Sequence, residues 1–421
     1  MKNLKCIILA AGAGKRMKTR MPKPLHKIAG ITMLERLLNT VLSLGIKNIV
    51  VVVGYASKRV EDVLKKYNVN MVKQDKLLGS ADAVKRARRY FAGFIGSVLV
   101  MYTDTPLLRK QTIRGLINKH LNSQATCTLL TADVKNRTGY GRIVRNINGN
   151  ITKIIEENTA TLQQKNISEI NVGAYCFDSK QLFNALKRVK KNPKKGEFYL
   201  TDVVKIFSDH GLEVKSYDRC AEDEAMGINS RKDLAAAENT LRKRKIKQLM
   251  QEGVTFIDPD TAYIDENVNI KQDTIIYPSV VIEGNVTIGS FCKIGPFARI
   301  RGKASIGDNS TVGNFVEVVR SRIGSNTRVK HHSYIGDAYV GNNVNVGAGV
   351  ITANYDGKKK HKTTIKDNAF IGVGSVLIAP VRIGKAALVG AGSVVTKNKN
   401  VPEKAVVVGV PARILKRGLK I

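Results

Sequence analysis

The amino-acid sequence predicts a doubly wound, Rossmann-like α/β domain over residues 1–230, a connecting helix over 231–253 and a parallel β-helix of hexapeptide repeats over 254–421. Two patterns support this architecture. Strand-like and helix-like segments alternate through the first domain, and an aliphatic residue recurs at every sixth position through most of the last one.

In the first domain, short β-rich runs alternate with amphipathic segments. The β-rich runs are KCIILA, NIVVVVG, SVLVMYTD and ATCTLLTA, and the amphipathic segments include MLERLLNTVLSLG, KRVEDVLKKY and TIRGLINKHL. This alternation predicts a parallel sheet with helices on both faces. Ligands of such sheets bind outside the carboxyl ends of the strands, so we expect a site there.

The first of these strand ends carries the glycine-containing loop LAAGAGKRM, from Leu9 to Met17. Its backbone amides and the cations Lys15, Arg16 and Lys23 suit a nucleoside triphosphate. The loop lacks the third glycine of the dinucleotide-binding fingerprint and the Gly-Lys-Ser/Thr of a P-loop.

A second strand end, in VLVMYTDTPLL, carries Asp104. A carboxylate at this edge could hold a hard cation such as Mg²⁺ beside the phosphates. A helix cap or a turn is the alternative role for this residue.

The basic run LRKRKIKQLM lies in the predicted connecting helix, and the hexapeptide pattern follows it. The aliphatic positions are Ile264, Ile270, Ile276, Ile282, Ile288, Ile294, Ile300, Ile306, Val312 and Val318, and then Ile365, Ile371, Leu377, Ile383, Val389 and Val395. Neither an α-helix nor an alternating strand repeats every six residues, whereas a parallel β-helix does. Single units cannot bury an apolar face, so they must stack with these residues inward.

Composition narrows the class of protein. With 421 residues and 43% hydrophobic content the chain can form two cores, and no apolar run approaches the roughly 20 residues of a membrane span. We therefore expect a cytoplasmic protein without membrane insertion. The five cysteines form no CxxC pair, which argues against a disulfide framework and against a zinc site.

The net charge of +36 would attract nucleic acid, anionic membranes or phosphorylated small molecules. The basic residues are spread over both domains, tryptophan is absent and no nucleic-acid motif is present. This distribution favours anionic small-molecule substrates over nucleic acid as partners.

The motifs taken together resemble a known family. LAAGAGKRM, PKPLH, GSADA, YTDTPLL, TGYGRI, EINVGAYCFD, GEFYLTD and GINS look like the uridylyltransferase half of the bifunctional N-acetylglucosamine-1-phosphate uridylyltransferase/glucosamine-1-phosphate N-acetyltransferases. IGPFARIR, VGNFVE, HHSYIGDAYVGNNVNVGAG and ITANYDG resemble the acetyltransferase half, a left-handed parallel β-helix. The resemblance covers nearly the whole chain in the same order.

For the first domain the resemblance implies a nucleotidyltransferase that uses UTP and Mg²⁺. Arg16 and Lys23 would act on the phosphates and Asp104 with Asn229 would ligate the metal. The remaining substrate-binding residues would be Leu9, Ala10, Ala11, Gly12, Gln74, Gly79, Ser80, Tyr102, Thr103, Gly141, Glu156 and Asn171.

For the β-helix the resemblance implies acetyl transfer from acetyl-CoA, with His331 as general base. An amine acceptor must lose a proton before it attacks a thioester, and imidazole suits that task. Arg301, Tyr334, Asn345, Asn354 and Tyr355 would bind the amino sugar 1-phosphate, and Ala348, Val373 and Ala391 would line the coenzyme pocket. An exposed corner residue is the alternative role of His331.

The chain departs from the family pattern at several positions. Val319 stands where the family has a second basic residue for the acceptor phosphate, and Arg320 follows it. Val373 replaces a serine near the coenzyme, Gly409 replaces a basic residue, and Thr103 replaces a glycine. The departures at 319, 373 and 409 leave the acetyl acceptor open.

Three hypotheses follow. The favoured one is a bifunctional enzyme, and by resemblance a homotrimer, that makes UDP-N-acetylglucosamine. The second is a sugar-1-phosphate nucleotidylyltransferase whose β-helix is structural or acetylates a different amino sugar phosphate. The third is a non-enzymatic interaction scaffold of the same architecture, against which the intact GAGKRM loop, Lys23 and Asp104 argue.

Overall fold

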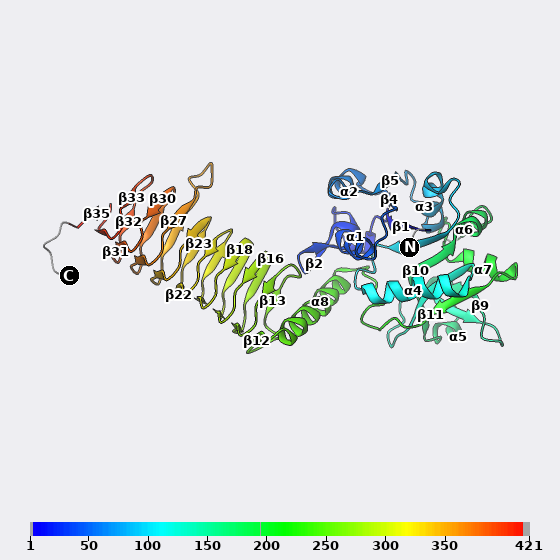
Figure 1. Cartoon of the computed structure of the whole chain (residues 1–421). Helices are drawn as coiled ribbons and strands as arrows, with labels where there is room; N and C mark the ends of the chain where they lie inside the picture. Colours follow the sequence, from blue (N-terminus) through cyan, green and yellow to red (C-terminus); the bar gives the residue numbers. More distant parts are fainter. Residues whose placement is uncertain (1–2, 194, 416–421) are drawn as a thin grey trace. The chain divides into compact units, whose positions relative to one another are not determined.

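The computed structural model describes residues 3–193 and 195–415, apart from the side chain of Lys15. The chain folds into two compact units, Met1–Glu238 and Asn239–Ile421, shown in Figure 1. In the described part of the chain, no helix combines the length and apolarity that a membrane crossing requires.

The first unit contains a nine-stranded sheet with the order β11-β7-β10-β6-β1-β4-β5, to which β8 and β9 are added. These strands are β1 (Leu4–Ala10), β4 (Ile49–Val53), β5 (Asn70–Lys73), β6 (Ser97–Tyr102), β7 (Cys127–Asp133), β8 (Arg142–Arg145), β9 (Ile151–Ile155), β10 (Glu169–Asp178) and β11 (Val214–Tyr217). A separate hairpin joins β2 (Lys27–Ile28) to β3 (Ile31–Thr32). In β1, Cys6 and Ile8 belong to one core and Ile7 and Leu9 to another, so both faces of the sheet are covered and the fold is doubly wound.

Helices cover the two faces of this sheet. They are α1 (Met33–Ser43), α2 (Ser57–Leu64), α3 (Ser80–Arg86), α4 (Lys110–Ser123), α5 (Leu162–Lys165), α6 (Ser179–Ala185) and α7 (Asp202–Asp209), with short 3-10 helices η1 (Lys15–Met17), η2 (Lys23–Leu25), η3 (Ala87–Phe91) and η4 (Glu157–Thr159). Residues of α1 and α4 pack in the core that contains Cys6, and residues of α3 and α7 pack in the core that contains Ile7.

The sheet is mixed rather than wholly parallel, because β10 runs antiparallel to both β6 and β7. The expectation of a parallel sheet is wrong for this strand. A parallel return needs a long crossover, usually a helix. Between β7 and β10 the chain instead forms the antiparallel pair of β8 and β9 and the four-residue helix α5.

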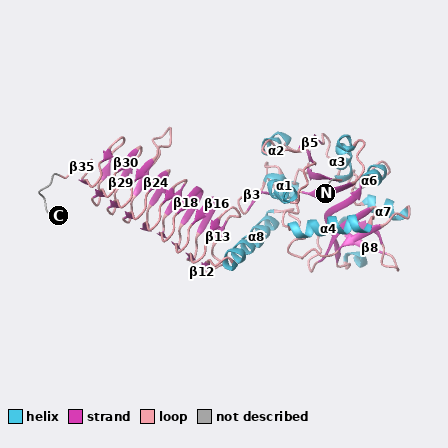
Figure 2. Ribbon diagram, in the orientation of Figure 1, coloured by secondary structure: helices cyan, strands magenta, loops and turns pink. Residues whose placement is uncertain are grey.

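The second unit contains a parallel β-helix, whose stacked coils are visible in Figure 2. One face is the sheet of β12 (Thr255–Phe256), β15 (Ile275–Ile276), β17 (Lys293–Ile294), β19 (Thr311–Asn314), β22 (Arg328–His331), β25 (Asn345–Val346), β28 (Phe370–Ile371), β31 (Leu388–Val389), β34 (Val406–Val408) and β35 (Arg413–Ile414). All neighbours in it are parallel except β34 and β35.

The other two faces form one hydrogen-bonded sheet. Its strands are β13 (Tyr263–Ile264), β14 (Asn269–Ile270), β16 (Val281–Ile288), β18 (Arg299–Ile306), β20 (Glu317–Val319), β21 (Arg322–Ile323), β23 (Tyr334–Gly336), β24 (Ala338–Val340), β26 (Ile351–Ala353), β27 (Thr363–Ile365), β29 (Val376–Ile378), β30 (Val381–Ile383), β32 (Val394–Val395) and β33 (Asn400–Val401). The long strands β16 and β18 turn a corner at Gly284 and Gly302, whose φ angles of 83° and 80° favour glycine.

The residues of both predicted six-residue series are buried in one continuous core, which confirms the inward orientation. Between the series, the inward position moves by five residues from Val318 to Ile323 and again from Ile335 to Val340. These two shortened corners are why the six-residue pattern breaks in the sequence there. The helix α8 (Arg231–Gln251) precedes the β-helix, and its Ile246 and Leu249 belong to the same core.

The β-helix offers a test of this packing in two isoleucines that differ in orientation. Ile300 is fully buried, whereas Ile351 is 43% exposed. We expect Ile300→Ala to lower the free energy of unfolding by about 2–5 kcal/mol, because it removes buried methyl groups and leaves a cavity. Ile351→Ala should change it by less than about 1 kcal/mol. Urea denaturation of both variants checks this, and equal losses would contradict the inward assignment.

Candidate functional site

A cavity of about 420 Å³ lies at the carboxyl ends of β1 and β6. Leu9 and Tyr102 are paired neighbours there, so the two strand ends meet at one edge. The cavity brings together ten of the residues expected to bind nucleotide, phosphate or metal. They are Leu9, Ala11, Gly12, Lys23, Gln74, Gly79, Ser80, Tyr102, Thr103 and Asp104.

The glycine loop brings its backbone to this cavity. A side chain on Gly12 would meet nothing within 4 Å, so the loop is open there. Gly14 has a φ of 62°, and a Cβ on it would lie 2.8 Å from the Cβ of Lys23. Two other predicted residues do not line the cavity: Ala10 is buried in β1, and Arg16 is exposed on η1.

Lys23, Asp104 and Asn229 converge on one point. The Nζ atom of Lys23 lies 2.7 Å from Oδ2 of Asp104 and donates to Oδ1 of Asn229 at 3.0 Å. Asn229 lies two residues before the start of α8, and its backbone N–H donates to the carboxylate of Asp233 at 2.9 Å. The two side-chain oxygens therefore already surround a positive charge, and they are the hard donors that Mg²⁺ prefers. The residues present fit the predicted metal.

Gln74, which we expect to contact the base, has its amide group oriented by two hydrogen bonds. Its amide nitrogen donates to the carbonyl of Gly79 at 3.0 Å and to the carboxylate of Asp82 at 2.8 Å. Both N–H donors are thereby occupied, so the amide offers a ligand only its carbonyl oxygen. Gly79 adopts a φ of 101°, and a Cβ there would lie 2.5 Å from the carbonyl oxygen of Phe198. Only glycine fits this approach.

Thr103 fits the strand edge without crowding. Its hydroxyl donates to the carbonyl of Leu9 at 3.2 Å, which turns it toward the backbone of β1. The threonine side chain that replaces the usual glycine therefore fits between the two strand ends. Thr103 also lines the cavity.

Hydrogen bonds orient the residues expected to hold the sugar. The backbone N–H of Asn171 donates to the carbonyl of Gly141 at 2.9 Å, and its side chain donates to Tyr175 at 2.7 Å. Glu156 accepts from Thr201 at 2.9 Å, and burial raises the pKa of its carboxyl. Burial likewise raises the pKa of Tyr102, so its phenol stays neutral as a hydrogen-bonding group.

In the β-helix, His331 and the three predicted coenzyme residues share one corner on successive coils. Backbone hydrogen bonds connect these coils. The N–H groups of Gly349, Gly374 and Gly392 donate to the carbonyls of His331, Ala348 and Val373, respectively. Because these glycines directly follow Ala348, Val373 and Ala391, the three predicted coenzyme residues form a column above the histidine. Val373 is 58% exposed and therefore presents a methyl surface at this corner.

His331 is exposed, and its Nδ1 lies 2.6 Å from Oδ1 of Asn314, one coil below. An amide oxygen accepts, so this contact places the proton on Nδ1 and leaves Nε2 of the neutral ring free to accept a proton. Asn314 is absent from the residues that sequence reasoning selected. Its position 17 residues before His331, one coil in this region, is the signal that could have found it. The adjacent His332 instead stacks on Phe315.

The acceptor residues on the neighbouring face carry paired charges. Nε of Arg301 donates to Glu317 at 2.6 Å, and Glu317 is the strand neighbour of Tyr334. Val319 is uncharged and fully buried, so it cannot contact an acceptor phosphate. Glu317, like Asn314, is a residue that sequence reasoning missed.

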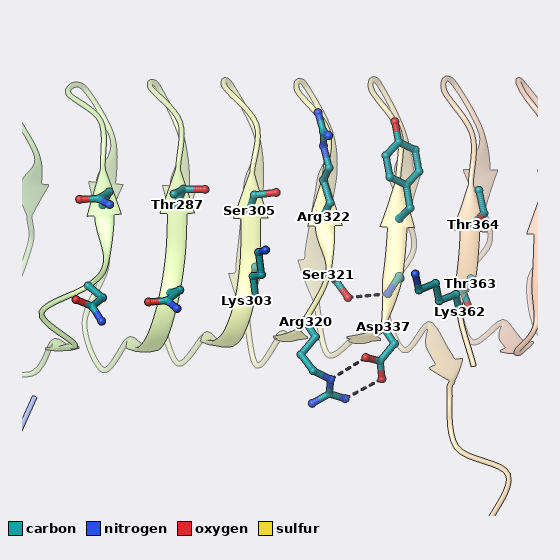
Figure 3. Close-up of a pocket in the computed structure, with 16 residues that line it drawn as sticks. Thr287, Lys303, Ser305, Arg320, Ser321, Arg322, Asp337, Lys362, Thr363 and Thr364 are labelled. Carbon is teal, nitrogen blue, oxygen red and sulfur yellow. Dashed lines mark hydrogen bonds and ion pairs between the residues drawn. The ribbon is translucent and has the colours of Figure 1, made fainter. Parts of the chain in front are cut away.

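Arg320 occupies the corner after Val319, and its guanidinium pairs with Asp337, as Figure 3 shows. Its guanidinium donates to both carboxylate oxygens at 2.7 Å, and Asn354 donates to the same carboxylate. This network fixes Asn354 but leaves the carboxylate-bound Arg320 without a free charge for a phosphate.

Two predicted residues lie apart from this group within the chain. Asn345 is on β25, on the face that contains β22 and β28, whereas Tyr334 is on a different face. Tyr355 is 60% exposed, and its hydroxyl donates to the carbonyl of Gly357 at 2.6 Å. One chain alone therefore does not collect all the acceptor residues.

A groove of about 590 Å³ runs along the outer surface of β14, β16, β18, β21, β24 and β27. Figure 3 shows its polar side chains in repeating rows, with Arg320 and Asp337 at its corner. Its other cations are Lys303, Arg322 and Lys362. The groove contains none of the residues expected to act in acetyl transfer.

The pair of Arg320 and Asp337 predicts a pH dependence. The guanidinium lowers the pKa of Asp337 below its usual 3.8, so the pair stabilises the fold above that pH and the contribution is lost as the pH falls through the lowered pKa. We expect Asp337→Asn to lower the unfolding free energy at pH 7 by about 1–2 kcal/mol, a range that allows for partial exposure. Urea denaturation at pH 7 and pH 3 checks this, and a loss of equal size at both pH values would contradict it.

Comparison with known proteins gives the same division of the chain. Residues 6–205 match the MobA-like NTP transferase domain family, and residues 267–302, 285–320 and 362–397 match the bacterial transferase hexapeptide family.

Whole-length relatives carry both domains. The chain is 42% identical to the bifunctional protein GlmU of Geobacillus sp. (strain WCH70), over 95% of this chain and 94% of that protein. It is 41% identical to the proteins of the same name from Streptococcus agalactiae serotype V, over 98% and 96%, and from Carboxydothermus hydrogenoformans, over 96% and 96%. At this identity and coverage, the chain belongs to the bifunctional GlmU family.

Proposed function

We propose that the chain makes UDP-N-acetylglucosamine in two steps. It acetylates glucosamine 1-phosphate with acetyl-CoA and then transfers a uridylyl group from UTP to the resulting N-acetylglucosamine 1-phosphate. The observation that carries this function is the presence of two separate groups of reactive side chains on one chain. One surrounds Lys23 at the strand ends, and the other lies beside His331 on the β-helix.

In the uridylyl reaction, a phosphate oxygen of the sugar 1-phosphate attacks the α-phosphorus of UTP in line, and pyrophosphate leaves. No protein nucleophile is needed, so catalysis is positioning and charge neutralisation. The backbone of the loop at Gly12 cradles the phosphates, Lys23 neutralises them, and Gln74 accepts from the base. Mg²⁺, held by Asp104 and Asn229, would neutralise further phosphate charge when bound.

In the acetyl reaction, Nε2 of His331 accepts a proton from the acceptor amine. The amine nitrogen then attacks the thioester carbonyl, and the coenzyme leaves as a thiolate that takes up a proton. Asn314 holds the ring in the tautomer that this step requires. The column of Ala348, Val373 and Ala391 gives the coenzyme a surface along successive coils.

Further assignments belong to this proposal. The substrates are UTP, amino sugar 1-phosphates and acetyl-CoA, the metal is Mg²⁺, the location is the cytoplasm, and neither nucleic acid nor membrane is a partner. The domain boundaries are 1–230, 231–253 and 254–421. A homotrimer fits the separation of Asn345 from Tyr334 on different faces, because a second copy would supply the missing residue.

One observation favours an alternative second activity. Val319 carries no charge, Asp337 binds Arg320, and Glu317 binds Arg301, so neither arginine is free of a carboxylate partner for an acceptor phosphate. The alternative is a sugar-1-phosphate nucleotidylyltransferase whose β-helix is structural or acetylates a different amino sugar phosphate.

Parallel assays of the intact chain separate these functions. One follows coenzyme A release from acetyl-CoA with glucosamine 1-phosphate, and the other follows pyrophosphate release from UTP with N-acetylglucosamine 1-phosphate. Both reactions support the bifunctional assignment. Pyrophosphate release alone supports the alternative. The absence of both reactions would overturn the proposal. Light scattering on the same sample tests the trimer.

A further inference from the structure

Lys23 occupies the centre of the candidate metal site. Its ammonium contacts Oδ2 of Asp104 at 2.7 Å and Oδ1 of Asn229 at 3.0 Å, and its side chain is only 12% exposed. Mg²⁺ binds such oxygens at about 2.0–2.1 Å. A divalent metal and an ammonium that shared this one pair of oxygens would repel each other at close range, so the two cations compete for the site.

The backbone of Lys23 is restricted by its neighbours, and its side chain lines the cavity. Lys23 lies between Pro22 and Pro24, whose rings fix the main chain at both positions. The stem of Lys23 lies against Gly14 of the phosphate loop, since a Cβ on that glycine would lie 2.8, 3.4 and 3.5 Å from its Cβ, Cγ and Cδ atoms. Lys23, Gly14 and Asp104 also line the same cavity of about 420 Å³, so the ammonium faces the loop and the carboxylate across one shared space.

We propose that Lys23 is the resident cation of the metal-free site, and that Mg²⁺ displaces it and thereby frees its ammonium for the nucleotide phosphates. The inference rests on the proposed uridylyl transfer but goes beyond it, because it couples two groups that the reaction uses separately. The acidic oxygen of Asp104 stays neutralised in both states. The phosphate-binding cation becomes available only when the metal is present.

The proposal makes an unusual prediction for metal binding. If Lys23 were a helper of the metal, its loss would weaken binding. Because the Lys23 ammonium competes with the metal, Lys23→Met should strengthen the binding of Mn²⁺ in the absence of nucleotide by about ten- to a hundredfold. This factor corresponds to one charge-assisted hydrogen bond that the metal no longer has to break. Lys23→Arg keeps the positive charge and should bind Mn²⁺ no more tightly than the parent.

Electron paramagnetic resonance of free Mn²⁺ measures this affinity on the full chain without any turnover. Lys27→Met is the matched control, because Lys27 is an exposed lysine four residues away. Asp104→Asn should abolish tight binding and so places the Mn²⁺ at this site. Affinity that is unchanged or lowered in Lys23→Met would overturn the proposal.

A second measurement needs no variant at position 23. In the parent chain, Mg²⁺ should increase the rate at which an amine-reactive acylating reagent labels Lys23, relative to Lys27, as quantified by mass spectrometry. An amine released from Asp104 reacts faster than a paired one. An equal rate with and without Mg²⁺ contradicts displacement. Pyrophosphate release by the parent, followed in parallel, reports separately on the proposed function.

Discussion

Replacing His331 with alanine should lower the rate of acetyl transfer by about 10²- to 10⁴-fold, the range for the loss of a general base. The acceptor amine is mostly protonated near neutral pH, and the free Nε2 of His331 is the proton acceptor that the corner provides. Uridylyl transfer should keep its rate, because its residues lie in the other compact unit. Coenzyme A release and pyrophosphate release, measured on one preparation, check both halves.

The neighbouring histidine is the matched control for this experiment. His332 stacks on Phe315 and has no assigned role in proton transfer, so His332→Ala should keep acetyl transfer within a few-fold of the parent. Asn314→Leu should lower kcat by removing the contact that fixes the tautomer, with a smaller change in KM. Equal losses in the variants at 331 and 332 would remove His331 from its assigned role.

The β-helix could be predicted closely from the sequence because its signal is local and repeated. Each coil places an aliphatic residue in the same environment, so Ile294 and Ile300 are both buried for the same reason. The pattern breaks where the corners at Arg320 and Asp337 are each one residue shorter, with φ of 50° and 48°. The two corner residues, Arg320 and Asp337, pair with each other across one coil, and a repeating aliphatic pattern does not predict this pairing.

The candidate sites were predictable to different degrees. Strand ends and glycine turns located Gly12 and Asp104, since their positions follow from chain order within a parallel sheet. The antiparallel course of β10 did not follow from its β-rich sequence, because strand direction is decided by the connection before it. The contact of Lys23 with Asn229, 206 residues apart, is a tertiary event with no local pattern.

Replacing Asp104 with alanine should reduce uridylyl transfer by at least about 10²–10³-fold and leave acetyl transfer unchanged. The variant loses the carboxylate proposed to bind the metal, and of the two contacts that Lys23 makes with Asp104 and Asn229 it keeps the one with the neutral Asn229. Added Mg²⁺ should not restore the rate, because the remaining amide oxygen is a single neutral donor. Pyrophosphate release across a magnesium series measures this.

Asp62→Ala is a suitable control, because that carboxylate is 67% exposed and pairs with Lys65, the next residue after α2. It should leave both activities intact. Magnesium-dependent pyrophosphate release that persisted in Asp104→Ala would remove Asp104 from the reaction and would leave Lys23 as a plain structural partner. Loss of both activities together would instead indicate a folding defect. A selective loss is expected, because the carboxylate is 31% exposed at the cavity and its backbone, rather than its side chain, bonds Ile228.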